Sequence, residues 1–395
     1  METPATYLLR QLTGYFLKLG TTGFGGPPAL IGYMHRDLVQ TRQWISEADY
    51  REGLALAQLA PGPLAAQLAI YLGYVHYGVL GATVVGLAFV LPSFLMVVVI
   101  GWAYVRFGGL PWMQAVFYGI GAAVIAIIAI GTYKLTRKTI APRDALGWGL
   151  FGASALTTAV LETELIWLVL IAGLLYWFVK APPRSLGTGQ LGALTLAAPR
   201  PGWELLGLDA PDSILWKLAF FFTKAGAFVF GSGLAIVPFL YGGVVKEYGW
   251  LTEQQFLDAV AVAMITPGPV VITVAFIGYL VAGWPGACVA ALATFLPCYL
   301  LTILPAPYFK RYGRRPGIKA FVDGVTMAAV GAIAGAVVVL TRRQLVADGR
   351  PDWPSVGLAL LTGLLLWRFK NLPESWLIVG AAVIGLLLKT GPALL

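Results

Sequence analysis

Two lysines lie within apolar stretches of the sequence, and a group of glycines follows each of them. Lys18 precedes the motif GFGGPP at residues 23–28, and Lys224 precedes FGSG at residues 230–233. A lysine in the middle of a bilayer costs roughly 2.5 to 3.5 kcal/mol, so a duplicated one indicates a purpose. Ammonium groups near backbone amides that lack bulky side chains are suited to binding an anion. The alternative is that both lysines extend towards the lipid headgroups.

The glycines and prolines predict interrupted helices. A helix that stops near residue 25 and restarts with Pro27 and Pro28 in its first turn loses no hydrogen bond at those prolines. The segment APGP at residues 60–63 repeats this pattern after a helix that begins near Glu47. Each restart exposes unpaired amides and the positive end of a helix dipole. The anion-binding residues predicted at the breaks are Gly25, Gly26, Gly62, Gly231, Ser232, Gly233 and Gly268. Simple kinking of membrane helices is the alternative.

Polar side chains near the breaks are further candidates for contact with a substrate. Gln58 and Gln67 flank APGP, and Thr266 and Thr273 flank the related segment TPGP. Hydrogen bonding to a substrate and packing between helices explain these side chains equally well.

Two glutamates occupy matched positions ahead of the PGP segments. Glu47 and Glu253 each follow a hydroxyl residue at the start of an expected helix, which is the pattern of ordinary helix capping. The alternative role for this pair is proton coupling or gating.

The amino-acid composition indicates whether the helices that carry these residues lie in water or in lipid. The 395 residues are 58% hydrophobic and 11% charged, whereas a soluble domain has about 25% charged residues. This composition predicts an all-α polytopic membrane protein in a lipid bilayer. The net charge of +9 comes largely from short loops between apolar spans, which indicates membrane orientation rather than nucleic-acid binding.

Eight apolar segments are candidates for membrane-spanning helices. They are residues 79–105, 112–134, 144–161, 163–179, 285–308, 317–341, 354–369 and 373–389. Motifs of nucleotide-binding, metalloprotease and serine hydrolase sites are missing from the sequence. With two histidines and two cysteines in the whole chain, we expect no metal centre, no cofactor and no enzymatic activity.

The chain repeats itself at an offset of 206 residues. Lys18 aligns with Lys224, WISEADY at residues 44–50 with WLTEQQF, and APGP with TPGP. The predicted organisation is an N-terminal repeat at residues 1–180, a linker rich in proline and glycine at 181–212, and a C-terminal repeat at 213–395.

Basic loops predict that the two copies lie upside down with respect to each other. The loop at residues 106–111 has one basic residue, whereas its partner at 310–319 has five. The next two pairs of loops also differ in charge, and cytoplasmic loops carry the excess of Lys and Arg. An inverted repeat requires an odd number of crossings in each copy, so we expect one of the broken helix pairs to be re-entrant.

Inverted repeats with broken helices are typical of secondary transporters that bind their substrate near the middle of the membrane. The helix starts and the two lysines favour a doubly negative substrate, such as a tetrahedral oxyanion. An anion channel is the alternative, because a positively lined path serves either mechanism.

The motifs together resemble the chromate ion transporter (CHR) family in its long, two-domain form. The resemblance is carried by GFGGP after a lysine, by Trp44 with Asp49 five residues later, and by LAQLAPGP at residues 56–63. It implies a protein of the prokaryotic cytoplasmic membrane that exports chromate, with sulfate as a related or exchanged anion; sulfate or other oxyanion uptake is the alternative. A homo-oligomer is compatible with the sequence and is not required by it.

Overall fold

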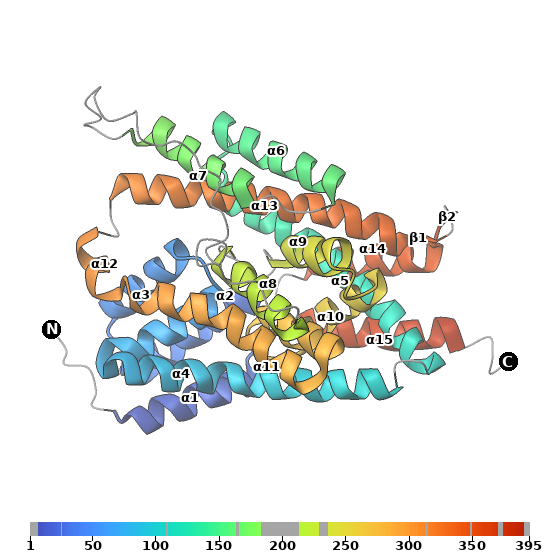
Figure 1. The fold of residues 1–395 in the computed structure, drawn as a ribbon, viewed down its shortest axis with the longest axis horizontal. Coiled ribbons are helices and arrows are strands. Elements are labelled where there is room, and N and C mark those ends of the chain that lie inside the picture. The colour runs from blue at the N-terminus through green and yellow to red at the C-terminus, as the bar shows by residue number, and fades with distance from the viewer. Residues whose placement is uncertain are drawn as a thin grey trace.

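The computed structural model describes residues 7–24, 26–107, 110–162, 166–182, 213–228, 236–312, 315–347, 350–369 and 374–390. Their regular secondary structure is helical apart from one short hairpin of β1 (Val346–Ala347) and β2 (Arg350–Pro351). Most long helices run along the long axis of the molecule (Figure 1). Four described helices are long and apolar enough to cross a membrane, by length and composition, and three shorter ones are also apolar.

The helices of the first copy reappear in the second in the same order. The first copy contains α1 (Leu9–Thr22), α2 (Gly26–Met34), the π-helix η1 (His35–Thr41), α3 (Glu47–Leu59), α4 (Leu64–Phe107), α5 (Pro111–Thr139), α6 (Ala145–Leu161) and α7 (Ile166–Lys180). The second contains α8 (Ile214–Phe228), α9 (Ile236–Leu240), the π-helix η3 (Tyr241–Glu247), α10 (Glu253–Ile265), the 3-10 helix η4 (Val270–Ile272), α11 (Thr273–Ile303), α12 (Ala306–Tyr312), α13 (Pro316–Leu345), α14 (Trp353–Arg368) and α15 (Glu374–Thr390). The two π-helices are separated by the predicted 206 residues, so the tandem duplication extends to unusual local geometry.

Both α4 and α11 fold back on themselves as helical hairpins. Gly78 has φ 57° and ψ −149°, and Gly283 has φ 62° and ψ −151°. A Cβ atom on Gly73 would collide with the carbonyl oxygen of Gly81, although eight residues of continuous helix would separate them by about 12 Å. The second arms, from residues 79 and 284, coincide with two of the predicted spans. The turns themselves were not predicted.

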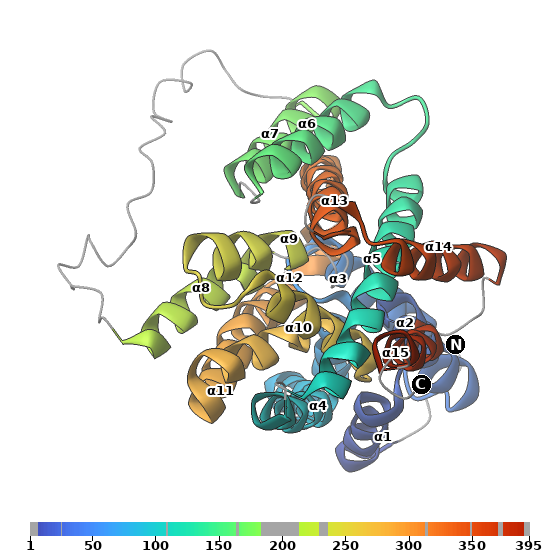
Figure 2. The same ribbon diagram turned by 90° about the vertical axis from the view of Figure 1, so that its right-hand side faces the viewer.

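The other six predicted spans are observed as α5, α6, α7, α13, α14 and α15. The last two helices of each copy pack against the other copy. Helices α6 and α7 lie on α13, and α14 and α15 lie on α5 (Figure 2). Glycines permit this close packing, since a Cβ on Gly331 would overlap the carbonyl oxygen of Phe151 and one on Gly119 that of Ala381.

Equivalent segments of the two copies run antiparallel at the centre. The hydroxyl oxygens of Thr83 in α4 and Tyr299 in α11 are 2.6 Å apart. Farther along, the ring of Phe94 lies 5.8 Å from that of Trp284. The largest buried apolar cluster therefore contains residues of both copies.

Large apolar side chains also point outward from the bundle. Leu87, Leu360 and Trp376 are 57%, 69% and 70% exposed. A water-soluble monomer rarely exposes apolar surface on this scale, so lipid chains are the natural surroundings of these faces.

Candidate site at the helix breaks

The breaks of opposite copies touch. Helix α1 ends at Thr22 and α2 starts at Gly26, with Pro27 and Pro28 in its first turn as predicted. Helix α10 ends at Ile265 and its PGP segment follows. The Gly268 amide donates a hydrogen bond of 2.9 Å to the carbonyl oxygen of Gly23. The glycine-rich break of the first copy is thus joined by backbone to the TPGP break of the second.

The second-copy break is tightly packed by a long helix of the first copy. Ser93 of α4 is fully buried, and its hydroxyl donates a hydrogen bond of 2.7 Å to the carbonyl oxygen of Pro267. Gly268 has φ +100°, and a Cβ atom there would overlap Ser93 Oγ. Only glycine satisfies both the backbone angle and the space.

The first-copy break is packed in the reciprocal way but with different chemistry. Cys298 of α11, which aligns with Ser93, lies beside Gly62, whose φ is +139°. The side-chain nitrogen Nε2 of Gln67 donates a hydrogen bond of 2.7 Å to the carbonyl oxygen of Pro61. Gln67 is fully buried, and its Oε1 has no hydrogen-bond partner among the described residues. A buried acceptor of this kind calls for a ligand or a water molecule.

The hydroxyl groups of the corresponding threonines in the second copy are hydrogen bonded. Thr273, the counterpart of Gln67, donates to the carbonyl oxygen of Val270 at 2.8 Å, and Thr266 donates to that of Val262 at 2.6 Å. Gln58 is exposed on α3, whereas Gln67 is buried. Of the polar residues predicted near the PGP breaks, Gln67 therefore has the clearest capacity for a ligand.

The remaining glycines of the prediction fall into two groups. Gly26 has φ +69° at the start of α2, and, apart from its chain neighbours and the backbone of its own helix, no atom of the described residues lies within 4 Å of the place where its Cβ would be. Open space beside a helix start permits an anion to reach the amides. The predicted residues Gly25, Gly231, Ser232 and Gly233 lie outside the described residues, as does nearly all of the linker predicted at 181–212.

Lys18 and Lys224 are both exposed on the helices that precede the glycine-rich segments. In α1 the opposite face is buried through Leu12, Phe16 and Leu19. The Lys224 ammonium lies 4.0 Å from the centre of the Phe220 ring, a cation–π contact within its own helix.

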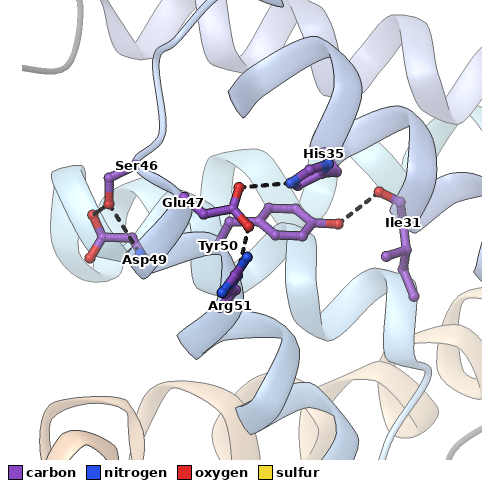
Figure 3. Close-up of polar contacts among 7 residues, drawn as sticks. All are labelled: Ile31, His35, Ser46, Glu47, Asp49, Tyr50 and Arg51. Carbon is purple, nitrogen blue, oxygen red and sulfur yellow. Dashed lines mark hydrogen bonds and ion pairs between the residues drawn. The ribbon is translucent and has the colours of Figure 1, made fainter. Parts of the chain in front are cut away.

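Glu47 is the centre of a polar cluster at the start of α3 (Figure 3). Ser46 caps this helix as predicted, accepting a hydrogen bond from the Asp49 amide. Glu47 Oε2 lies 2.8 Å from His35 Nε2, and Oε1 accepts from Arg51 at 2.6 Å. These two hydrogen bonds hold the pKa of Glu47 below its ordinary value, so this carboxylate stays ionised at neutral pH.

Glu253 occupies the same place in the second copy, with a different set of partners. Thr252 caps α10, and the hydroxyl of Tyr241, which aligns with His35, donates to Glu253 at 3.0 Å. The ammonium of Lys246 lies 3.4 Å from Glu253 and 2.5 Å from Glu162 of the first copy. The hydrogen bond to Glu162 raises the pKa of Lys246. The contact of Lys246 with Glu162 links the two copies.

Two further acidic residues were not among the candidates predicted from the sequence. Glu52 and Asp258 are also separated by 206 residues, but they lie five residues inside α3 and α10. The hydroxyl of Tyr71 donates to Glu52 at 2.8 Å, and that of Tyr104 donates to Asp258 at 2.7 Å. Their distance from the helix start was the signal that distinguishes them from capping residues.

Comparisons with known proteins agree with this architecture. The family model described as "Chromate transporter" matches residues 10–177 and 216–386, one match in each copy. A chromate transport protein of Cupriavidus metallidurans is 65% identical over 98% of this chain and 94% of its own length. A probable chromate transport protein of Synechococcus elongatus is 61% identical over 96% of both chains, and a chromate transport protein of Pseudomonas aeruginosa is 30% identical over 91% of this chain and 88% of its own. No solved structure matches. The repeated fold, the apolar helices and these full-length similarities show that the chain is a multi-pass membrane protein and belongs to the chromate transporter family.

Proposed function

We propose that this protein is a secondary transporter that exports chromate across the prokaryotic cytoplasmic membrane, with sulfate as the related or exchanged anion. The observation that carries the proposal is the hydrogen bond between Gly268 and Gly23, because it brings breaks from opposite copies together as a shared binding site requires. The names of the relatives identify the anion as chromate.

The inverted arrangement of the copies is part of this proposal. It is supported by the antiparallel packing of the second arms of α4 and α11, which are equivalent segments. Helix α3 has 13 residues and the first arm of α4 is about as long, so each extends only about 20 Å against a hydrocarbon thickness of about 30 Å. We assign these two segments, and their counterparts, as re-entrant.

Backbone amides supply most of the attraction for the anion. The start of α2 at Gly26 contributes unpaired amides and a partial positive charge, and we propose that Gly25 takes part in the same binding. We assign the same role to the segment at Gly231, Ser232 and Gly233 of the second copy. Lys18 and Lys224 add formal charge to the approach, which raises the local concentration of anions.

Gln67 contributes selectivity in this scheme. Its free Oε1 accepts hydrogen bonds, so it pairs with the hydroxyl of hydrogen chromate. Sulfate carries no proton at neutral pH and cannot donate. The threonines at 266 and 273 support the surrounding backbone through their hydrogen bonds to carbonyl oxygens, and we propose that the exposed Gln58 contacts the anion on its path to the site.

Glu47 and Glu253 act as gates in the proposed mechanism. Each holds the π-helix that precedes its own helix, through His35 in the first copy and through Tyr241 and Lys246 in the second. The ion pairs of Glu47 with His35 and of Glu253 with Lys246 lie between partly exposed side chains. Breaking such pairs costs little energy, which suits a movement that occurs in every transport cycle.

Chromate flux into proteoliposomes tests the proposal. We expect the initial rate to saturate with chromate concentration, and internal unlabelled chromate to accelerate uptake of external labelled chromate. Sulfate should compete with lower apparent affinity. Large unsaturated currents without counterflow would identify a channel instead, and flux restricted to sulfate would identify a different carrier.

A further inference from the structure

We propose that Asp258 is the proton-binding group through which a pH gradient drives the transport of the anion. The inference rests on the proposed function, since it concerns the energy source of the same carrier. The residue is 3% exposed, and its carboxyl group joins the two copies through Tyr104.

The comparison with a second buried carboxylate shows what is unusual about Asp258. Asp144 is 8% exposed, but the ammonium of Lys180 lies 2.9 Å from it and supplies a compensating charge. Asp258 accepts hydrogen bonds from the neutral groups of Tyr104 at 2.7 Å and Gln254 at 2.9 Å. Burying a carboxylate without an opposite charge is energetically unfavourable, and taking up a proton neutralises the carboxylate.

The described residues of the elements packed against α10 place no compensating positive charge beside the Asp258 carboxylate. From α4 comes the Tyr104 hydroxyl, whose ring is packed between Phe117 of α5 and Phe276 of α11. From η3, Lys246 is paired with Glu162 and Glu253. The acidic and basic residues of α15 that the structure describes, Glu374 and Lys389, lie at its two ends. Among the described residues, no ion pair reaches the Asp258 carboxyl group.

Asp258 lies where the uptake of a proton can affect the proposed substrate site. Helix α10 runs from Asp258 to the TPGP break over seven residues, or about 10 Å. Tyr104 belongs to the other copy and lies close to the end of α4 at Phe107. When a hydronium ion transfers a proton to the carboxylate, one O–H bond of the hydronium ion breaks, one O–H bond forms on Asp258, and the hydrogen bond from Tyr104 that holds the copies together weakens. Release of the proton to a water molecule breaks the carboxyl O–H bond, forms hydronium again and restores the strength of that hydrogen bond. No electrons are transferred.

The first copy provides a matched comparison. Glu52 aligns with Asp258, but its hydrogen bond comes from Tyr71 of its own copy. Phe309 aligns with Tyr104 and has no hydroxyl. Of these two aligned carboxylates, Asp258 is bonded to a tyrosine of the other copy and Glu52 to a tyrosine of its own, and we expect Glu52 to have no part in coupling.

The test uses the full-length protein in proteoliposomes, with labelled chromate and an imposed pH gradient. In the wild type the gradient should accelerate net chromate transport severalfold. Asp258→Asn should reduce this acceleration to a ratio near one, while chromate–chromate exchange stays within about twofold at equal protein abundance. Glu52→Gln should keep the full response, Asp258→Glu should restore part of it, and Tyr104→Phe should shift the active range to higher pH.

The outcomes separate the two proposals. A full response to the pH gradient in Asp258→Asn would overturn the coupling role, as would a wild-type flux that ignores the gradient; either result leaves the carrier mechanism standing. Loss of exchange in Asp258→Asn, with no rescue by Asp258→Glu, would make the residue structural. Absence of counterflow in the wild type would instead remove the carrier mechanism itself.

Discussion

The two PGP breaks have almost the same sequence, APGP and TPGP, but different surroundings. In the second copy, Gly268 is bonded to Gly23, and Ser93 occupies the space beside it. In the first copy, Gly62 lies against a thiol and a glutamine with a free acceptor. The difference teaches that a duplicated motif serves as a structural joint in one copy and keeps a hydrogen-bonding position available in the other.

The largest effect should follow from a substitution at Gly268, whose hydrogen bond to Gly23 joins the two copies. Gly268→Ala places a side chain at φ +100° and against Ser93, and such backbone strain alone costs about 1–3 kcal/mol. We expect a marked fall in membrane abundance and in the thermal unfolding temperature in detergent. Gly62→Ala is strained too but displaces the movable end of Gln67, so it should lose transport with a smaller loss of abundance.

The control is Gly152→Ala, at an exposed helical position where no atom lies within 4 Å of the new Cβ. It should behave as the wild type. Equal abundance of the Gly268 and Gly62 variants would show that the two breaks do not differ as joints.

A smaller effect is expected at the hydrogen-bonding position. Gln67→Leu removes the free acceptor, and a hydrogen bond to a charged partner contributes about 1.5–3 kcal/mol, so the apparent affinity for chromate should fall on the order of tenfold or more. Competition by sulfate should change little. Thr273→Val, the matched change in the second copy, should leave chromate affinity within about twofold. A similar loss in both variants would contradict the assigned difference between the breaks.

The smallest effect should come from the exposed lysines. Lys18→Ala and Lys224→Ala are each expected to reduce chromate uptake about threefold at low ionic strength, and less at high salt, because exposed charges are screened. Lys217→Ala, on the same helix as Lys224, serves as a charge-matched control. Wild-type uptake in both lysine variants at normal abundance would remove them from the proposed approach path.

Much of the fold follows from local properties of the sequence. Apolar length predicted the eight helices, Ser46 and Thr252 predicted the starts of α3 and α10, and the paired prolines predicted the start of α2. The hairpin turns at Gly78 and Gly283 were missed, because a single glycine in an apolar run is compatible with a continuous helix. The reversal depends on the close contact of Gly73 with Gly81, which only the folded chain reveals.

The candidate site was less accessible to prediction because its contacts join distant residues. The repeat identified Gly62 and Gly268 as equivalent, but it gave no means of placing Ser93 or Cys298 beside them. Asp258 accepts a hydrogen bond from Tyr104, which is 154 residues away in the sequence. No periodic pattern in the sequence predicts that contact. The exposure of the two lysines likewise depends on which face of α1 and α8 meets its neighbours.

The reciprocal contacts of Ser93 and Cys298 have an evolutionary consequence. In an assembly of two identical subunits, every substitution appears twice, so a change that improves one break also alters the other. A single gene that encodes both copies lifts this restriction. Natural selection can then adjust anion preference at Gln67 and Cys298 while the partner residues at Thr273 and Ser93 stay as they are.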